Sequence, residues 1–138
     1  MMSTIEARET ELRTNLDALE DWFSQYEYLL GFAEDLDELP EEERTAQTRI
    51  EGCTAPAWLS LTKKRDGSVA FRGTSDALTV RALLGLIADL IAGIPSEEVT
   101  SWEPTFMEHA AIQEHFTTDR KAGLQEVLRR IRAFATEG

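Results

Sequence analysis

The residue in this chain best suited to covalent chemistry is its single cysteine, Cys53. Cys53 follows Gly52 and precedes residues 54–56 (Thr-Ala-Pro), which indicates a turn rather than the helix or strand where structural cysteines usually pack. A thiol with an ordinary pKa of about 8.5 is only a few per cent thiolate at neutral pH, yet that thiolate is strongly nucleophilic. Arg49 is the nearest basic residue in sequence, and acidic surroundings favour the neutral thiol, so we expect activation to come from a partner.

The two histidines, His109 and His115, are weaker candidates for chemistry. They lie six residues apart, which does not place them on one face of a helix as a pair of ligands. Each alone is expected to be a surface or capping residue. A single cysteine excludes an intrachain disulfide and a cysteine-rich zinc site, and we expect neither a bound metal nor a cofactor. Two alternatives remain open: a thiol-dependent hydrolase that uses Cys53 with His115, and a non-catalytic interaction domain whose cysteine is structural.

The first third of the chain is predicted to be helical. Ser3 and Glu6 fit a capping box that begins a helix, and Ser24 and Glu27 repeat the pattern and predict a second helix or a kink. An acidic run and a proline within residues 34–44 end that segment, and one further helical turn is expected over 41–44. Apolar residues recur at helical spacing along the first helix, at Leu12, Leu16, Leu19 and Phe23.

The middle of the chain changes to a strand pattern. Short strands are predicted over 48–51, 57–62 and 69–71, with Asp66-Gly67 as a strong turn signal between the last two. Residues 52–56 would join the first two strands. These segments predict a small antiparallel sheet of about three strands.

Helices are predicted for the rest of the chain. Ser75 is expected to cap a long helix that stops at Gly93, with Asp76 in its first turn. Pro95 and Pro104 open two shorter helical pieces, and a last helix runs from about residue 119. The predicted fold is therefore α+β, with helices packed against one face of a small sheet, and we expect residues 1–138 to form one domain. The apolar side of the long helix is expected to comprise Leu78, Leu83, Leu84, Ile87, Leu90 and Ile91.

Charge limits the classes of partner. The chain has 26 acidic and 14 basic residues, a net charge of −12, which disfavours nucleic acid and anionic membranes. Residues 1–44 hold 14 acidic and 3 basic residues, whereas residues 45–138 hold 12 and 11. This asymmetry fits a solvated surface, and it also fits steering towards a basic partner. No membrane span or secretory signal is recognisable, so we expect a cytoplasmic protein.

Several blocks of this sequence stand out as a set: residues 39–45 (LPEEERT), 49–53 (RIEGC), Trp58, 73–77 (GTSDA), 115–117 (HFT) and Arg120 with Gly123 and Leu124. Together these blocks resemble the signature of SufE-type sulfur-acceptor proteins. They cover nearly the whole chain in the order and spacing of that family. Beside the cysteine the chain departs from the usual pattern, because Thr54, Ala55 and Ala57 replace the family's usual Gln, Ser and Val.

The resemblance implies that Cys53 carries sulfur. SufE-type proteins accept sulfane sulfur from a pyridoxal-phosphate cysteine desulfurase of the SufS or CsdA kind, stimulate that enzyme, and pass the sulfur to an iron–sulfur assembly scaffold. They share an α+β fold with IscU-type scaffolds. The free carrier tends to keep its sulfur in an apolar cavity, for which Trp58 and the helix after Ser75 could supply walls. Contacts with the partner are expected at Arg49, Gly52, Thr54, Ala55, Asp76 and Arg120.

Overall fold

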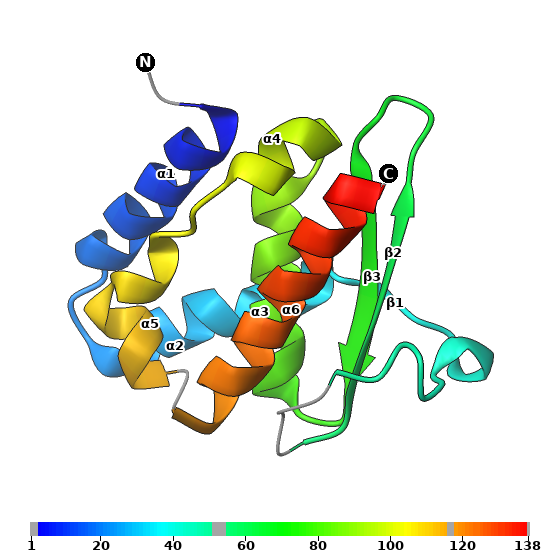
Figure 1. Ribbon diagram of the computed structural model, residues 1–138. Coiled ribbons are helices and arrows are strands. Elements are labelled where there is room, and N and C mark those ends of the chain that lie inside the picture. Colours follow the sequence, from blue (N-terminus) through cyan, green and yellow to red (C-terminus); the bar gives the residue numbers. More distant parts are fainter. Residues whose placement is uncertain (1–2, 51–54, 116–117, 138) are drawn as a thin grey trace.

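The computed structural model describes residues 3–50, 55–115 and 118–137, and for 118–122 and 135–137 the description extends to the backbone only. Figure 1 shows a narrow sheet with the helices gathered on one side of it, which confirms the expected α+β class. The strands are β1 (Asp37–Glu38), β2 (Ala57–Lys63) and β3 (Val69–Ser75). The helices are α1 (Thr4–Ala18), α2 (Trp22–Leu30), α3 (Leu78–Ile91), α4 (Ser96–Ser101), α5 (Ala110–His115) and α6 (Thr118–Glu137), with 3-10 turns η1 (Gly31–Asp35), η2 (Glu41–Glu43) and η3 (Phe106–Glu108).

The sheet has the order β1-β3-β2 and is mixed rather than purely antiparallel. β2 and β3 form the expected hairpin around Asp66-Gly67, where Gly67 adopts a φ of +87° that favours glycine. β1 pairs with β3 in parallel, with Asp37 opposite Arg72, and the sequence did not indicate it. The strand predicted over 48–51 was wrong in extent, because Arg49 makes only an isolated bridge with Trp58 and residue 51 lies outside the described residues.

Two predictions about the first helices need correction. The Ser3–Glu6 capping box is present, but α1 ends at Ala18, so Phe23 does not continue its apolar stripe and is 72% exposed. α2 begins at Trp22 and not after Ser24. Its N-cap is Asp21, whose carboxylate accepts the Ser24 N–H at 2.8 Å. An acidic side chain just before the first turn satisfies a free helical N–H, and that local interaction sets the start of the helix.

The strand-to-helix junction at Ser75 also differs from the prediction. Ser75 is the last residue of β3 and not the N-cap of the long helix, which begins at Leu78 after Ala77. The Ser75 hydroxyl donates to the Pro56 carbonyl at 2.7 Å and accepts the Ala77 N–H at 3.2 Å, so it joins β2 to the chain before α3. Asp76 therefore precedes the helix. Leu78, expected on the apolar side, is 46% exposed.

The core lies between the sheet and the outer helices, and α3 is its centre. α3 packs against β3 on one side and against η1 and α2 on the other. The side of α6 that faces the core is buried at Leu124, Val127, Leu128 and Ile131. α4 and η3 follow Pro95 and Pro104 as predicted, whereas α5 is a further short helix that the sequence pattern did not indicate. Among the described residues, no helix has both the length and the apolar character needed to cross a bilayer.

Candidate functional site

Residues 48–50 and 57–59 lie side by side and form a stem beneath the segment that carries Cys53. The Ile50 N–H donates to the Ala57 carbonyl at 2.8 Å, and the Leu59 N–H donates to the Thr48 carbonyl at 2.7 Å. Ile50 and Ala57 are both buried. Backbone hydrogen bonds therefore hold together the two ends of residues 51–56, which we call the Cys53 segment.

The outgoing end of the Cys53 segment is also tied to the strand-to-helix junction. The Pro56 carbonyl accepts the Ser75 hydroxyl at 2.7 Å and the Asp76 N–H at 3.3 Å. Asp76 is exposed, and Ala55 packs against the core. Ser75 and Asp76 from the GTSDA block thus meet the chain that leaves the RIEGC block, although the two blocks are some 20 residues apart in sequence.

The structure therefore gathers three of the expected site residues around this segment: Arg49 at its incoming side, and Ala55 and Asp76 at its outgoing side. Gly52, Cys53 and Thr54 lie outside the described residues, as does the side chain of Arg120, whose backbone belongs to the first turn of α6. Their roles stay predictions.

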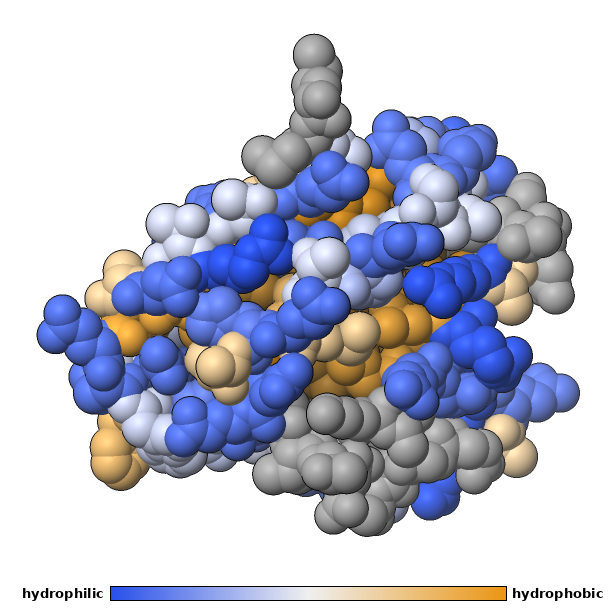
Figure 2. Space-filling model, turned by 60° about the vertical axis from the view of Figure 1, so that its left-hand side comes forward, coloured by the Kyte–Doolittle hydropathy of each residue, from blue (hydrophilic) through white to orange (hydrophobic). Residues whose placement is uncertain are grey.

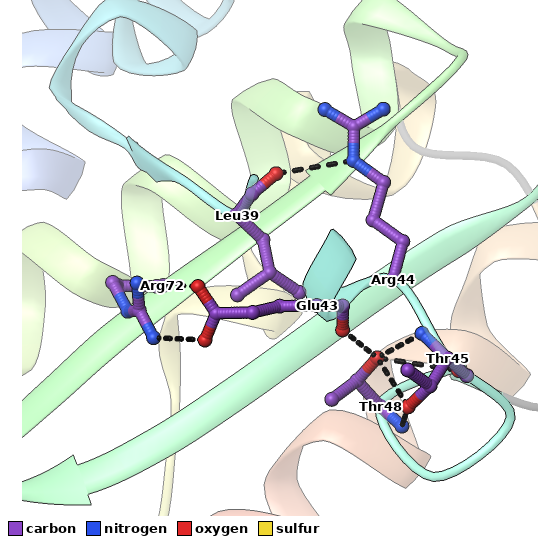
Figure 3. Close-up of polar contacts among 6 residues, drawn as sticks. All are labelled: Leu39, Glu43, Arg44, Thr45, Thr48 and Arg72. Atoms are coloured by element: carbon purple, nitrogen blue, oxygen red, sulfur yellow. Dashed lines mark hydrogen bonds and ion pairs between the residues drawn. The ribbon is translucent and has the colours of Figure 1, made fainter. Parts of the chain in front are cut away.

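Figure 3 shows the polar contacts that hold the LPEEERT block, residues 39–45, in place. Arg44 donates through Nε to the Leu39 carbonyl at 3.0 Å, and Glu43 forms an ion pair with Arg72 of β3, with 2.7 Å between Nη2 and Oε1. The Thr48 hydroxyl donates to the Glu43 carbonyl at 2.8 Å and accepts the Thr45 N–H at 2.9 Å. These bonds fix residues 39–48 against the sheet and so position the incoming side of the stem.

Trp58 lies at the base of the Cys53 segment and is half-buried. The guanidinium groups of Arg44 and Arg49 lie 5.9 and 6.0 Å from its ring centre, within the range of cation–π attraction. Arg49 is exposed, and its bridge to Trp58 keeps it beside the stem. In a chain with a net charge of −12, these two cations form a local basic site next to the cysteine-bearing segment.

Arg130 on α6 holds the stem from the other side. Its guanidinium donates to the Thr48 carbonyl at 3.2 Å and to the Arg49 carbonyl, and its Nε donates to Glu126 at 3.1 Å. The hydrogen bond from Arg129, together with that from Arg130, lowers the pKa of Glu126 to about 2 against the opposing effect of burial. Glu126 thus stays ionised and orients Arg130, a residue that no sequence motif singled out.

Replacing Arg130 by glutamine is expected to loosen this stem. Two carbonyls lose a charged donor, so we expect the free energy of unfolding to fall by roughly 1–2 kcal/mol. Hydrogen exchange at the Ile50 and Leu59 amides, which close the stem, should become faster. Arg129→Gln is the matched control, because it removes an exposed ion pair with the same Glu126 and should change neither amide much. Equal exchange in both variants would show that Arg130 does not hold the stem.

A small apolar cavity lies under Ile50, between α3 and α6. Its volume is about 10 Å³, close to that of one water-sized sphere, and its walls include Ile50, Leu84 and Leu124. The helix after Ser75 supplies one wall of this cavity. A resting place for the sulfur here stays a prediction, because Cys53 lies outside the described residues. Trp58 does not line this cavity, and the other wall comes from α6.

His115 is buried, with 5% of its surface exposed, at the end of α5. Its ring packs against Trp22 and Tyr26 of α2, with ring centres 4.7 and 5.4 Å away. Neither ring nitrogen has a hydrogen-bond partner in the described part of the chain. Among the described residues, no group orients a proton on this ring, as the hydrolase alternative would need. His109 does cap a helix, as expected, since its Nδ1 accepts the Ala111 N–H at 3.0 Å.

Burial lowers the pKa of His115, and nearby Glu114 opposes this only in part. The unfolded chain therefore takes up a proton at a higher pH than the folded chain. The contribution of neutral His115 to the free energy of unfolding is fully present above the pKa of the unfolded chain, about 6.5. It is lost as the pH falls towards the lower pKa of His115 in the folded chain. We expect the free energy of unfolding in urea to differ less between pH 7.5 and pH 5.5 for His115→Phe than for the wild type. An unchanged difference would contradict the shifted pKa, and His109→Gln is the control.

The comparisons with known proteins agree with this arrangement. Residues 10–135 match the family model SufE, described as an Fe-S metabolism associated domain. A solution structure described as a hypothetical protein from Thermus thermophilus has the same fold, with a TM-score of 0.75 and 22% sequence identity over 97% of this chain and 94% of that one. The chain belongs to the SufE family and has a role in Fe–S metabolism.

Proposed function

We propose that this protein is a sulfur carrier that accepts persulfide sulfur on Cys53 from a pyridoxal-phosphate cysteine desulfurase and relays it to an iron–sulfur assembly scaffold. The observation that carries the proposal is the setting of the single cysteine. Its segment is short, and both ends are tied down by the stem, by Ser75 and Asp76, and by Arg130. Such a base allows one thiol to be presented to a partner while the rest of the fold stays rigid.

The transfer needs no oxidant. The Cys53 thiolate attacks the outer sulfur of the desulfurase persulfide, a new S–S bond forms at Cys53, and the old S–S bond breaks. The desulfurase cysteine leaves as a thiolate, and Cys53 becomes a persulfide. Arg49 and Arg44, beside Trp58, supply positive charge near the incoming side of the segment and would favour the anionic sulfur. Removal of the persulfide frees the desulfurase cysteine, which accounts for the proposed stimulation of that enzyme.

A carrier suits this chain better than a cluster scaffold. An iron–sulfur cluster is usually held by several thiolates, and the sequence supplies one. In the described ranges, no group of three or more His, Cys, Asp or Glu side chains could hold a metal ion. The pyridoxal phosphate chemistry belongs to the partner. We place the protein in the cytoplasm, where thiols stay reduced, and propose that the chain works as one domain.

The test is the intact mass of the reduced protein after incubation with a cysteine desulfurase, pyridoxal phosphate and free cysteine. We expect a gain of one sulfur atom, about 32 Da, which a reductant removes. The Cys53→Ser variant should gain nothing and should still bind the desulfurase.

The other outcomes separate the alternatives. Mass gain in Cys53→Ser would place the sulfur elsewhere and contradict the proposal. Absence of a gain with several desulfurases, together with unchanged stability of Cys53→Ser, would favour an interaction domain. Loss of turnover on an ester or amide in that variant would favour a hydrolase, although the described part of the chain gives the ring of His115 no hydrogen-bond partner that would orient it.

A further inference from the structure

The described surface exposes few large apolar side chains, and they are grouped at helix starts. They are Trp22 and Phe23, the first two residues of α2, which are 44% and 72% exposed, and Leu78, the first residue of α3, which is 46% exposed. Both helices begin towards the lower end of the molecule in Figure 1, where β2 also starts. In that view α2 begins at the left and β2 at the right, so the start of α2 and the start of β2 are separated across the width of the molecule.

The aromatic residues of α2 form an ordered cluster, which we call the aromatic patch (Trp22, Phe23 and Tyr26). The Trp22 ring stacks on Tyr26 with centres 4.9 Å apart and meets Phe23 edge-on at 5.3 Å. His115 packs against Trp22 and Tyr26 from α5. Its buried imidazole has no hydrogen-bond partner among the residues that the structure describes, and it acts here as an apolar support. Trp22 is thus fixed in place, while Phe23 projects into solvent.

The segment that carries the aromatic patch is acidic. Residues 17–27 contain four exposed acidic residues, Asp17, Glu20, Asp21 and Glu27, and no lysine or arginine. Hydrogen bonds from Ser24 lower the pKa of Asp21, which directly precedes the patch, so that this carboxylate stays ionised. Figure 2 shows that hydrophilic residues cover most of the face visible there, with apolar residues between them. Exposed aromatic residues flanked by acidic side chains are typical of a surface that binds a positively charged partner.

We propose that the aromatic patch is a second docking point for the cysteine desulfurase, where Phe23 enters an apolar pocket rimmed by lysine or arginine side chains of that enzyme. The proposal rests on the proposed sulfur-carrier function. A second copy of this chain is a poorer occupant, because a symmetric contact at the patch would place the acidic residues of 17–27 against the same residues of the other copy. Two separated contacts, one at the patch and one around the Cys53 segment, would fix the orientation of the carrier during transfer.

The patch is expected to act on binding and not on the chemical step. Phe23 is 72% exposed, so its truncation removes little from the folded protein but removes an anchor from an interface. We expect Phe23→Ala to raise the Kd for the desulfurase by about tenfold or more. The rate of persulfide transfer at saturating carrier should be unchanged, because Phe23 does not belong to the Cys53 segment. Phe23→Leu should restore most of the affinity.

Charge is tested by paired variants. Glu20→Gln with Glu27→Gln neutralises two exposed acidic residues near the patch, and we expect weaker binding that depends less on salt. Glu97→Gln with Glu98→Gln is the matched control, since both residues are exposed on α4 towards the opposite end of Figure 1. All variants are compared with wild type by calorimetric titration of a desulfurase that loads wild-type protein in the mass experiment.

The outcomes separate the two proposals. Loading of wild type together with an unchanged Kd for Phe23→Ala would overturn the docking point and leave the carrier function intact. If the wild type forms a dimer in sedimentation experiments and Phe23→Ala dissociates that dimer, the patch binds a second copy. This result would also overturn the docking point for the desulfurase. A wild type that neither binds nor is loaded by any desulfurase overturns both proposals.

Discussion

The Gly85→Ala substitution is expected to lower the free energy of unfolding by roughly 3 kcal/mol. Gly85 lies in α3 where the helix touches η1, and a Cβ built there would lie 1.9 Å from the Phe32 carbonyl oxygen and 2.7 Å from its carbonyl carbon. Both neighbours are backbone atoms, so no rotamer change can relieve the overlap. α3 and η1 would have to move apart, and the buried contacts along α3 would loosen with them.

Gly31→Ala is the matched control for this substitution. Gly31 has a φ of −58°, and a Cβ there would meet nothing within 4 Å. It should leave the protein unchanged or stabilise it by about 0.4–1 kcal/mol, since alanine restricts the unfolded chain. Urea unfolding of the two variants measures the difference. Equal midpoints would show that α3 and η1 do not pack as closely as the structure has them.

Truncation of Glu9 to alanine is expected to cost about 3–5 kcal/mol. Glu9 is 1% exposed, and its carboxylate accepts the Trp102 Nε1–H at 3.0 Å, the Thr105 N–H at 2.7 Å and the Phe106 N–H at 2.8 Å. Without it, these donors remain inside the fold with no acceptor, and a cavity is left as well. The turn before η3 would then be held to α1 mainly by the hydrogen bond from Arg13 to the Thr105 hydroxyl.

Glu11→Ala tests whether this loss is specific, because Glu11 lies exposed on the same helix and should change stability little. Glu9→Gln should be intermediate, since one amide oxygen still accepts while the amide nitrogen faces donors. Thermal unfolding followed by circular dichroism ranks the three variants. A Glu9→Ala protein as stable as Glu11→Ala would contradict the role assigned to the buried carboxylate.

Glu9 was detectable in the sequence, although most acidic residues of such a charged chain are expected to be solvated. It lies four residues after Ile5 and three before Leu12, and both of these are buried on the same face of α1. Arg130 was not detectable in this way. Its partners are the carbonyls of Thr48 and Arg49, some 80 residues away, and no local pattern specifies which backbone a long side chain will reach.

The candidate site was likewise partly visible in the sequence. Cys53 was predicted to be the functional residue because it is the single cysteine and because its neighbours indicate a turn, and it stays a prediction. Arg49, Ala55 and Asp76 lie where the structure closes the ends of its segment. The role predicted for Ser75 was wrong, because a serine before a helix can serve as an N-cap or as the end of a strand. Its hydrogen bond with Pro56, 19 residues earlier, decides between the two roles.

By itself, the sequence determined the elements that short-range interactions set: the Ser3–Glu6 capping box, the hairpin at Asp66-Gly67, and the apolar faces of α3 and α6. The tertiary structure decided the rest. It placed β1 parallel to β3, exposed Phe23 and buried His115. The physical reason is range: caps and turns depend on residues a few positions apart, whereas strand partners, buried polar groups and exposed anchors depend on which distant surfaces meet.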